Sequence, residues 1–99
     1  MNITVSELND RINRKLPIHI IDVREELEFH TFNIGGDNIP LGRLLGNFDE
    51  TDLDKENEII VLCQRGLRSE TARRALVSKG YENVKNLQGG LLAWRKAGY

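Results

Sequence analysis

The chain has 99 residues, the length of one small domain with a single hydrophobic core, so we expect one domain over residues 1–99. Its only cysteine, Cys63, cannot form an internal disulfide, and the sequence therefore shows no secreted disulfide framework. The formal net charge of -1 argues against a nucleic-acid binder. The sequence shows no segment typical of a signal peptide, and no run of about 18 apolar residues that would predict a membrane-spanning helix. We expect a cytoplasmic protein that binds neither nucleic acid nor membrane.

Hydrophobic periodicity predicts short strands that alternate with helices. Residues 58–63 are the clearest strand, a continuous apolar run typical of a strand buried on both faces of a parallel sheet. Residues 69–80 are the clearest helix, with Ser69 as its expected N-cap, and Ser6 is expected to cap the first helix. In chain order the expected strands are 3–4, 18–23, 38–41, 58–63 and 84–88, and the expected helices are 7–15, 25–32, 42–48, 69–80 and 90–98.

This alternation of strands and helices predicts the fold class. Strands separated by helices of about this length imply a mainly parallel central sheet with helices on both of its faces. The prediction is an α/β fold, a three-layer α/β/α sandwich. In such a sheet, ligands bind at the carboxyl ends of the strands, and Cys63 lies at that end of its strand.

The loop "CQRGLR", residues 63–68, connects the clearest strand to the clearest helix. A loop that curls there directs successive backbone N–H groups inward, and Gly66 supplies the freedom that a tight curl needs. The positive end of the following helix adds to an environment that favours an anion or a thiolate. Arg68 can offer a planar fork to an oxyanion, whereas we expect Arg65 to point outward. Residue type and position alone fit a small buried hydrophobe equally well.

Four motifs in the same order resemble those of the rhodanese family, and the resemblance covers almost the whole chain. The loop "CQRGLRS" is similar to the family's Cys-x-x-Gly-x-Arg-Ser active-site loop. The other three are "IIDVRE" at 20–25, "NIPL" at 38–41 and "NLQGGLLAW" at 86–94.

The resemblance implies a rhodanese-like fold and a sulfurtransferase activity. Cys63 would be the catalytic nucleophile, which takes a sulfane sulfur from a donor such as thiosulfate, becomes a persulfide and passes the sulfur to a thiol or cyanide. Asp22 and Arg24, with Ser69, would give structural support. The substrate-binding residues, through their backbone amides, would be Gln64, Arg65, Gly66, Leu67 and Arg68.

Attack by a thiolate on sulfur needs no separate proton relay, so neither histidine has to take part in the reaction, and we expect neither a metal nor a cofactor. His19 and His30 do not have metal-ligand spacing with the single cysteine. The segment "FNIGGDNIP", residues 32–40, departs from the family's usual "GHIPGAxNIP", and this departure leaves the acceptor preference open.

Two other functions compete with sulfur transfer. The first is the chemistry of a cysteine-based phosphatase or arsenate reductase, because cell-cycle phosphatases of the dual-specificity type share the fold and also use an anion loop that runs from a cysteine to an arginine. Those phosphatases place five residues between the two, where this chain has four. Many rhodanese-like domains are non-catalytic binding modules, but these commonly lack the cysteine. The expected partners are a small-molecule sulfur donor and a thiol or cyanide acceptor, with a sulfur-accepting protein as a further option, and the expected state is a monomer or a weak dimer.

Overall fold

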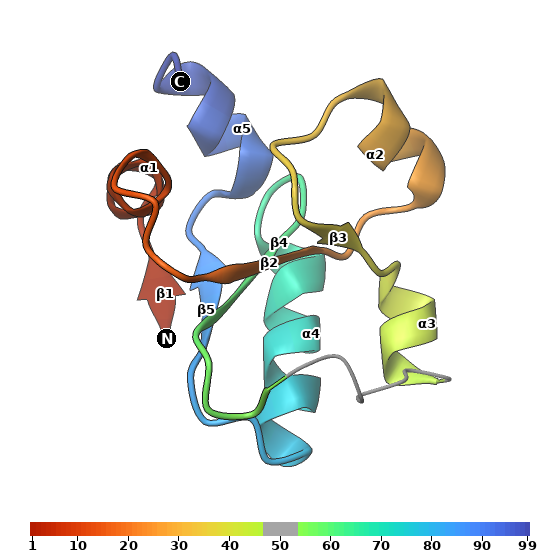
Figure 1. Cartoon of the computed structure of the whole chain (residues 1–99). Helices are drawn as coiled ribbons and strands as arrows, with labels where there is room; N and C mark the ends of the chain where they lie inside the picture. Colours follow the sequence, from red (N-terminus) through yellow and green to blue (C-terminus); the bar gives the residue numbers. More distant parts are fainter. Residues whose placement is uncertain (47–53) are drawn as a thin grey trace.

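The computed structural model describes residues 1–46 and 54–99 of the chain (Figure 1). Helices and strands alternate through these residues. The strands are β1 (Asn2–Ile3), β2 (His19–Asp22), β3 (Asp37–Asn38), β4 (Ile59–Leu62) and β5 (Val84–Leu87). The helices are α1 (Val5–Asn13), α2 (Glu26–Thr31), α3 (Leu41–Leu45), α4 (Leu67–Ser78) and α5 (Gly90–Lys96). The expected helix over 42–48 corresponds to α3, and its last two positions lie outside the described residues.

The strands form one sheet in the order β1-β5-β4-β2-β3, and every neighbouring pair is parallel. The apolar β4 lies in the middle, and all four of its residues are buried. Asp22, the last residue of β2, pairs with Leu62, the last residue of β4. The loops that follow β2 and β4 therefore leave the sheet side by side, as the parallel prediction requires.

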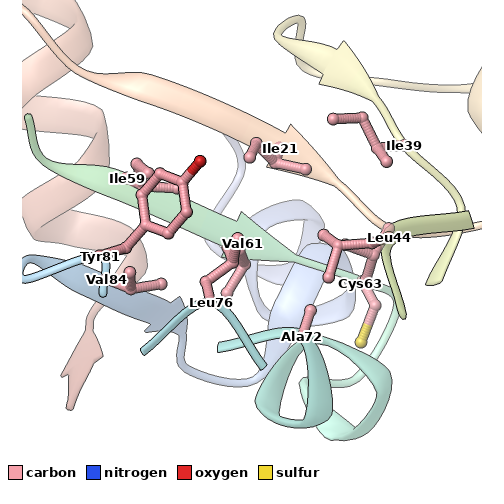
Figure 2. Close-up of a cluster of buried hydrophobic side chains, with 11 residues drawn as sticks. Ile21, Ile39, Leu44, Ile59, Val61, Cys63, Ala72, Leu76, Tyr81 and Val84 are labelled. Carbon is pink, nitrogen blue, oxygen red and sulfur yellow. The ribbon is translucent and has the colours of Figure 1, made fainter. Parts of the chain in front are cut away.

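Helices cover both faces of the sheet. Alternate residues of β4 point to opposite faces, so each face of this strand packs against a different set of helices. Ile59 and Val61, followed by Cys63, belong to a cluster that α3 and α4 complete with Leu44, Ala72 and Leu76 (Figure 2). Ile60 and Leu62 belong to a second cluster, which contains Leu8 of α1 and Leu91 and Trp94 of α5. The predicted three-layer α/β/α architecture is confirmed.

The first helix begins two residues earlier than the cap prediction required. Thr4, not Ser6, is the N-cap: its hydroxyl accepts the N–H of Glu7 at 3.1 Å, and the Glu7 carboxylate accepts the N–H of Thr4 at 3.0 Å. This is a reciprocal capping box of the Thr-x-x-Glu type. The prediction that Ser6 caps the helix is wrong because Ser6 has no acidic residue three positions later that could complete such a pair.

No helix that the structure describes is long and apolar enough to cross a membrane.

Candidate active site

Cys63 follows β4 directly and is almost completely buried, with 1% of its surface exposed. The chain then turns through Gly66, whose φ of +94° lies in the left-handed region, and enters α4 at Leu67. That conformation is costly for residues with a side chain, so glycine at this position permits the tight turn. The turn places the backbone N–H groups at the start of α4 beside the Sγ atom of Cys63.

The Sγ atom of Cys63 is surrounded by hydrogen-bond donors. It accepts the N–H of Gly66 at 3.1 Å and the N–H of Ser69 at 3.4 Å, and it lies 3.3 Å from the Ser69 hydroxyl. The prediction that Ser69 is the N-cap of its helix is wrong: Gly66 occupies that position and Ser69 is already in the first turn. The reason is that the cysteine sulfur accepts the helix N–H groups that a capping side chain would otherwise satisfy.

The pKa of the Cys63 thiol is lowered from its ordinary value. Burial acts in the opposite direction and raises it, because desolvation disfavours the charged thiolate. Hydrogen bonds from the hydroxyl and the N–H of Ser69, and from the N–H groups of Arg65 and Gly66, outweigh the cost of burial. The fold therefore favours the nucleophilic form of a cysteine that its burial alone would leave inert.

A polar pair behind the sulfur holds the loop in place. The hydroxyl of Ser69 donates to Oδ1 of Asn86 at 2.5 Å, and Nδ2 of Asn86 donates to the carbonyl of Gly66 at 2.9 Å. Ser69 and Asn86 are both buried. Asn86 in β5 thus bonds both the serine beside the sulfur and the glycine at the turn.

The start of α5 fixes the loop from the other side. The N–H groups of Leu91 and Leu92 donate to the carbonyls of Cys63 and Gln64, at 2.9 and 3.0 Å. Gly90 makes this approach possible, because a Cβ at that position would lie 2.5 Å from the Cys63 carbonyl oxygen. The "QGGLLAW" motif therefore contributes directly to the geometry of the cysteine loop.

Above the sulfur lies a pocket of about 320 Å³, lined by Cys63, Glu28, Gln64, Arg65, Leu67 and Arg68. The fork of Arg68 is bonded to the Glu28 carboxylate, with Nη1 to Oε1 at 2.7 Å and Nη2 to Oε2 at 3.0 Å. This pair lowers the pKa of Glu28 to about 2 and raises the pKa of Arg68. Arg65 is exposed at the rim. The arginine expected to receive an anion is therefore bonded by a carboxylate from α2.

Asp22 and Arg24 form a buried ion pair at the end of β2. The guanidinium of Arg24 contacts the Asp22 carboxylate through Nε at 2.9 Å and Nη2 at 2.7 Å. It also donates to the carbonyls of Phe32 at 2.7 Å and Glu28 at 3.3 Å. The pair thus connects the sheet to α2, the helix that carries Glu28.

Comparison with known proteins matches residues 4–97 to the model of a family described as the rhodanese-like domain. The chain belongs to this family. The thiosulfate sulfurtransferase GlpE of Shewanella oneidensis is 30% identical over 84 residues, which cover 81% of this chain and 78% of GlpE. The crystal structure of the Alr3790 protein from Anabaena sp. has a TM-score of 0.87 at 28% identity, covering 97% of this chain and 87% of that one.

Other relatives carry the rhodanese-like domain as a part of a longer protein. The probable adenylyltransferase/sulfurtransferase MoeZ of Mycobacterium tuberculosis is 30% identical over 95 residues, which cover 95% of this chain. The chain spans 24% of the length of MoeZ and about half of the length of two further curated relatives.

The segment that departs from the rhodanese pattern forms a turn and part of a second pocket. Asn33 donates to the carbonyl of Phe29 at 3.0 Å and accepts the N–H of Gly35 at 2.9 Å, which closes the turn. The Phe32 ring lies 4.6 Å from the Arg95 guanidinium. Phe32 and Arg95 line a pocket of about 360 Å³ that shares Glu28 and Gln64 with the pocket above the cysteine. The departure thus shapes a surface continuous with the site.

Two residues of this rhodanese site were missed by sequence reasoning. Asn86 gave a usable signal, since it is an uncharged polar residue inside the strand sequence "VKNL" and a buried amide has to find partners. Glu28 gave none, because acidic residues are common on an exposed helix and its partner lies 40 positions along the chain. Within residues 1–46 and 54–99 no group of three or more His, Cys, Asp and Glu side chains could hold a metal ion.

Proposed function

We propose that the protein transfers sulfane sulfur through a persulfide on Cys63. The observation that carries this proposal is the position of Sγ, which faces the pocket and accepts N–H groups from Gly66 and Ser69. These bonds stabilise the thiolate, the form of cysteine that attacks sulfur. Family membership and the relative named thiosulfate sulfurtransferase support the same chemistry.

The proposed reaction consists of two displacements. In the first, the Cys63 thiolate attacks the outer sulfur of a donor such as thiosulfate; a new S–S bond forms, the donor's S–S bond breaks, and sulfite leaves with the electron pair. In the second, cyanide or a thiolate attacks the terminal sulfur of the persulfide, and Cys63 leaves as a thiolate. Neither step changes the net number of electrons, so no oxidant or reductant is needed.

Measuring the mass of the intact protein tests the intermediate. After incubation with a sulfane donor, the wild-type protein should gain the mass of one sulfur atom, and a thiol should remove it. Cys63→Ser should show no gain and should release no thiocyanate from thiosulfate and cyanide. If the variant matches the wild type in thiocyanate release, Cys63 is not the nucleophile; if neither exceeds the uncatalysed rate, the chain is a binding module.

Phosphate ester hydrolysis is the nearest enzymatic alternative. Four residues separate Cys63 from Arg68, and the Arg68 fork is bonded to Glu28. Both features disfavour a tetrahedral dianion, which needs a wide loop and a free guanidinium. We expect no hydrolysis of an aryl phosphate above the rate of Cys63→Ser, and turnover by the wild type alone would contradict the sulfur assignment.

A second candidate acceptor is a protein thiol. Leu27 and Leu67 are 81% and 78% exposed, and each lines one of the two connected pockets. Large exposed apolar side chains at the edge of a reactive site offer contact area to a partner. We expect Leu27→Ser to slow sulfur transfer to a cysteine-containing peptide while leaving transfer to 2-mercaptoethanol unchanged, because Leu27 lines the adjoining pocket and not the one above Cys63. Equal effects on both acceptors would exclude this role.

A further inference from the structure

The carboxylate of Glu28 is fixed beside the cysteine pocket by partners on two sides. Its two oxygens accept the two Nη groups of Arg68, and Oε1 also accepts the N–H of Glu25 at 3.1 Å. The pKa of Glu28 is lowered to about 2, chiefly by the hydrogen bonds from Arg68, so the group is negatively charged at neutral pH. The guanidinium of Arg68 is therefore already occupied and neutralised by Glu28 when a sulfur donor enters the pocket.

The charges around the pocket do not favour a doubly charged donor. Arg68 and Glu28 largely cancel one another, and each is more than a third exposed. Of the other lining residues, Arg65 alone is cationic. The Cys63 thiolate that must attack is itself an anion. Arg65 is therefore the one net cation of the lining, and it faces both the Cys63 thiolate and the two charges of an entering dianion.

The Coulomb energy scales with the charge of the entering group. Thiosulfate carries two negative charges, so it loses about twice as much attraction as a donor with one when Glu28 neutralises Arg68, and a neutral donor loses none. The hydropersulfide of a small thiol, R–S–SH, carries at most one negative charge on its sulfurs. It transfers the same sulfane sulfur: the Cys63 thiolate attacks the outer sulfur, the S–S bond of the donor breaks, and RS⁻ leaves.

We propose that Glu28 is a specificity-determining residue that directs the site away from dianionic donors and toward hydropersulfides of small thiols. This inference rests on the proposed sulfur transfer. It assigns the Glu28 carboxylate a role at the pocket that is separate from its hydrogen bond to the N–H of Glu25, the N-cap of α2. The helix would keep its cap with a glutamine at this position, because a carboxamide oxygen can also accept the N–H of Glu25.

The test compares two charge-removing substitutions on the same helix. Glu28→Gln removes the pocket carboxylate and releases Arg68, whereas Glu26→Gln removes an exposed carboxylate that is not among the pocket residues. The rate of persulfide formation on Cys63 is measured by intact mass against the concentration of two donors, thiosulfate and the hydropersulfide of 2-mercaptoethanol. KM and the maximal rate are determined separately for each.

We expect wild-type Cys63 to take sulfur from the hydropersulfide more efficiently than from thiosulfate. Glu28→Gln should lower KM for thiosulfate about tenfold and change KM for the hydropersulfide less than about threefold. Glu26→Gln should change neither. A Glu28→Gln protein that loses rate with both donors alike, or keeps the wild-type KM for thiosulfate, overturns the inference while the proposed function stands. If neither donor loads wild-type Cys63, the proposed function fails as well.

Discussion

The hydroxyl of Ser69 lies between two acceptors, with Oδ1 of Asn86 at 2.5 Å and Sγ of Cys63 at 3.3 Å. Nδ2 of Asn86 donates to the carbonyl of Gly66, which fixes the amide orientation and leaves Oδ1 facing the serine. The single hydroxyl hydrogen therefore belongs to Asn86 while Cys63 is a thiol. When Cys63 is a thiolate, the hydrogen can turn to Sγ only by leaving Asn86. Stabilisation of the thiolate by Ser69 is thus partly offset.

Ser69→Ala should raise the pKa of Cys63, since the thiolate loses a donor while the N–H of residue 69 remains. In the wild type the Ser69 hydroxyl gains a hydrogen bond to the charged sulfur but gives up a neutral one to Asn86. We therefore expect the pKa of Cys63 to rise by about half a unit to one unit in the variant. The rate of alkylation by iodoacetamide, followed against pH, reports the shift. Ser78→Ala, which removes a hydroxyl bonded to Ala75 at the exposed end of the same helix, is the matched control and should leave the profile unchanged. A profile for Ser69→Ala that superimposes on the wild type would show that the hydroxyl never leaves Asn86.

The buried pair at the end of β2 predicts a large loss of stability. Arg24→Met removes the partner of Asp22, which is completely buried, and leaves a carboxylate without compensation. We expect the free energy of unfolding to fall by about 3–5 kcal/mol, measured by urea denaturation. Arg74→Met breaks a pair with Glu70 in which the arginine is 76% exposed, and it should cost less than about 1 kcal/mol. Similar losses for the two variants would contradict the assignment of Arg24 as a connection between the sheet and α2.

Acid should destabilise the protein through two carboxylates held by arginines. The pKa values of Glu28 and Glu70 fall from 4.5 to about 2, chiefly through hydrogen bonds from Arg68 and Arg73, respectively. Because the pKa values are lower in the folded state, these groups stabilise it fully above pH 4.5, and the contribution is lost as the pH falls through about 2. Urea denaturation at a series of pH values between about 2 and 6 should show a shallower dependence for Glu28→Gln combined with Glu70→Gln. The control Glu26→Gln should keep the wild-type slope, and an unchanged slope in the double variant would refute the prediction.

The sequence was a good guide to features that depend on neighbouring residues. The apolar run at β4 predicted a strand buried on both faces, and the alternation of elements predicted the parallel sheet, because both follow from local periodicity. The predictions of two helix N-caps, Ser6 and Ser69, were wrong for different reasons. Thr4 competed successfully with Ser6 through a local pairing with Glu7, whereas Ser69 was displaced by the cysteine sulfur, a partner outside the helix.

The candidate site was less predictable because its contacts are long-range. The position of Cys63 at the strand end could be inferred from the order of the elements. The bonds that hold its loop come from β5 and α5, and the carboxylate that binds Arg68 comes from α2. A pattern of residue types does not specify which of many acidic residues meets a given arginine, so only the folded geometry reveals the Glu28 contact.

Gly90 provides the last test, because two separate costs of a side chain can be distinguished there. Its φ of +62° makes a side chain unfavourable, and a Cβ would also lie 2.5 Å from the Cys63 carbonyl oxygen and 2.6 Å from the Gln64 carbonyl oxygen. Gly98 has a φ of +84°, but a Cβ there would have no neighbouring atom within 4 Å, so Gly98→Ala incurs the backbone cost alone, about 1 kcal/mol. Gly90→Ala should cost clearly more in urea denaturation and should also slow sulfur loading of Cys63, because the loop must move to admit the methyl group. If the two variants lose equal stability and both keep wild-type loading, the contact between α5 and the cysteine loop does not constrain the site.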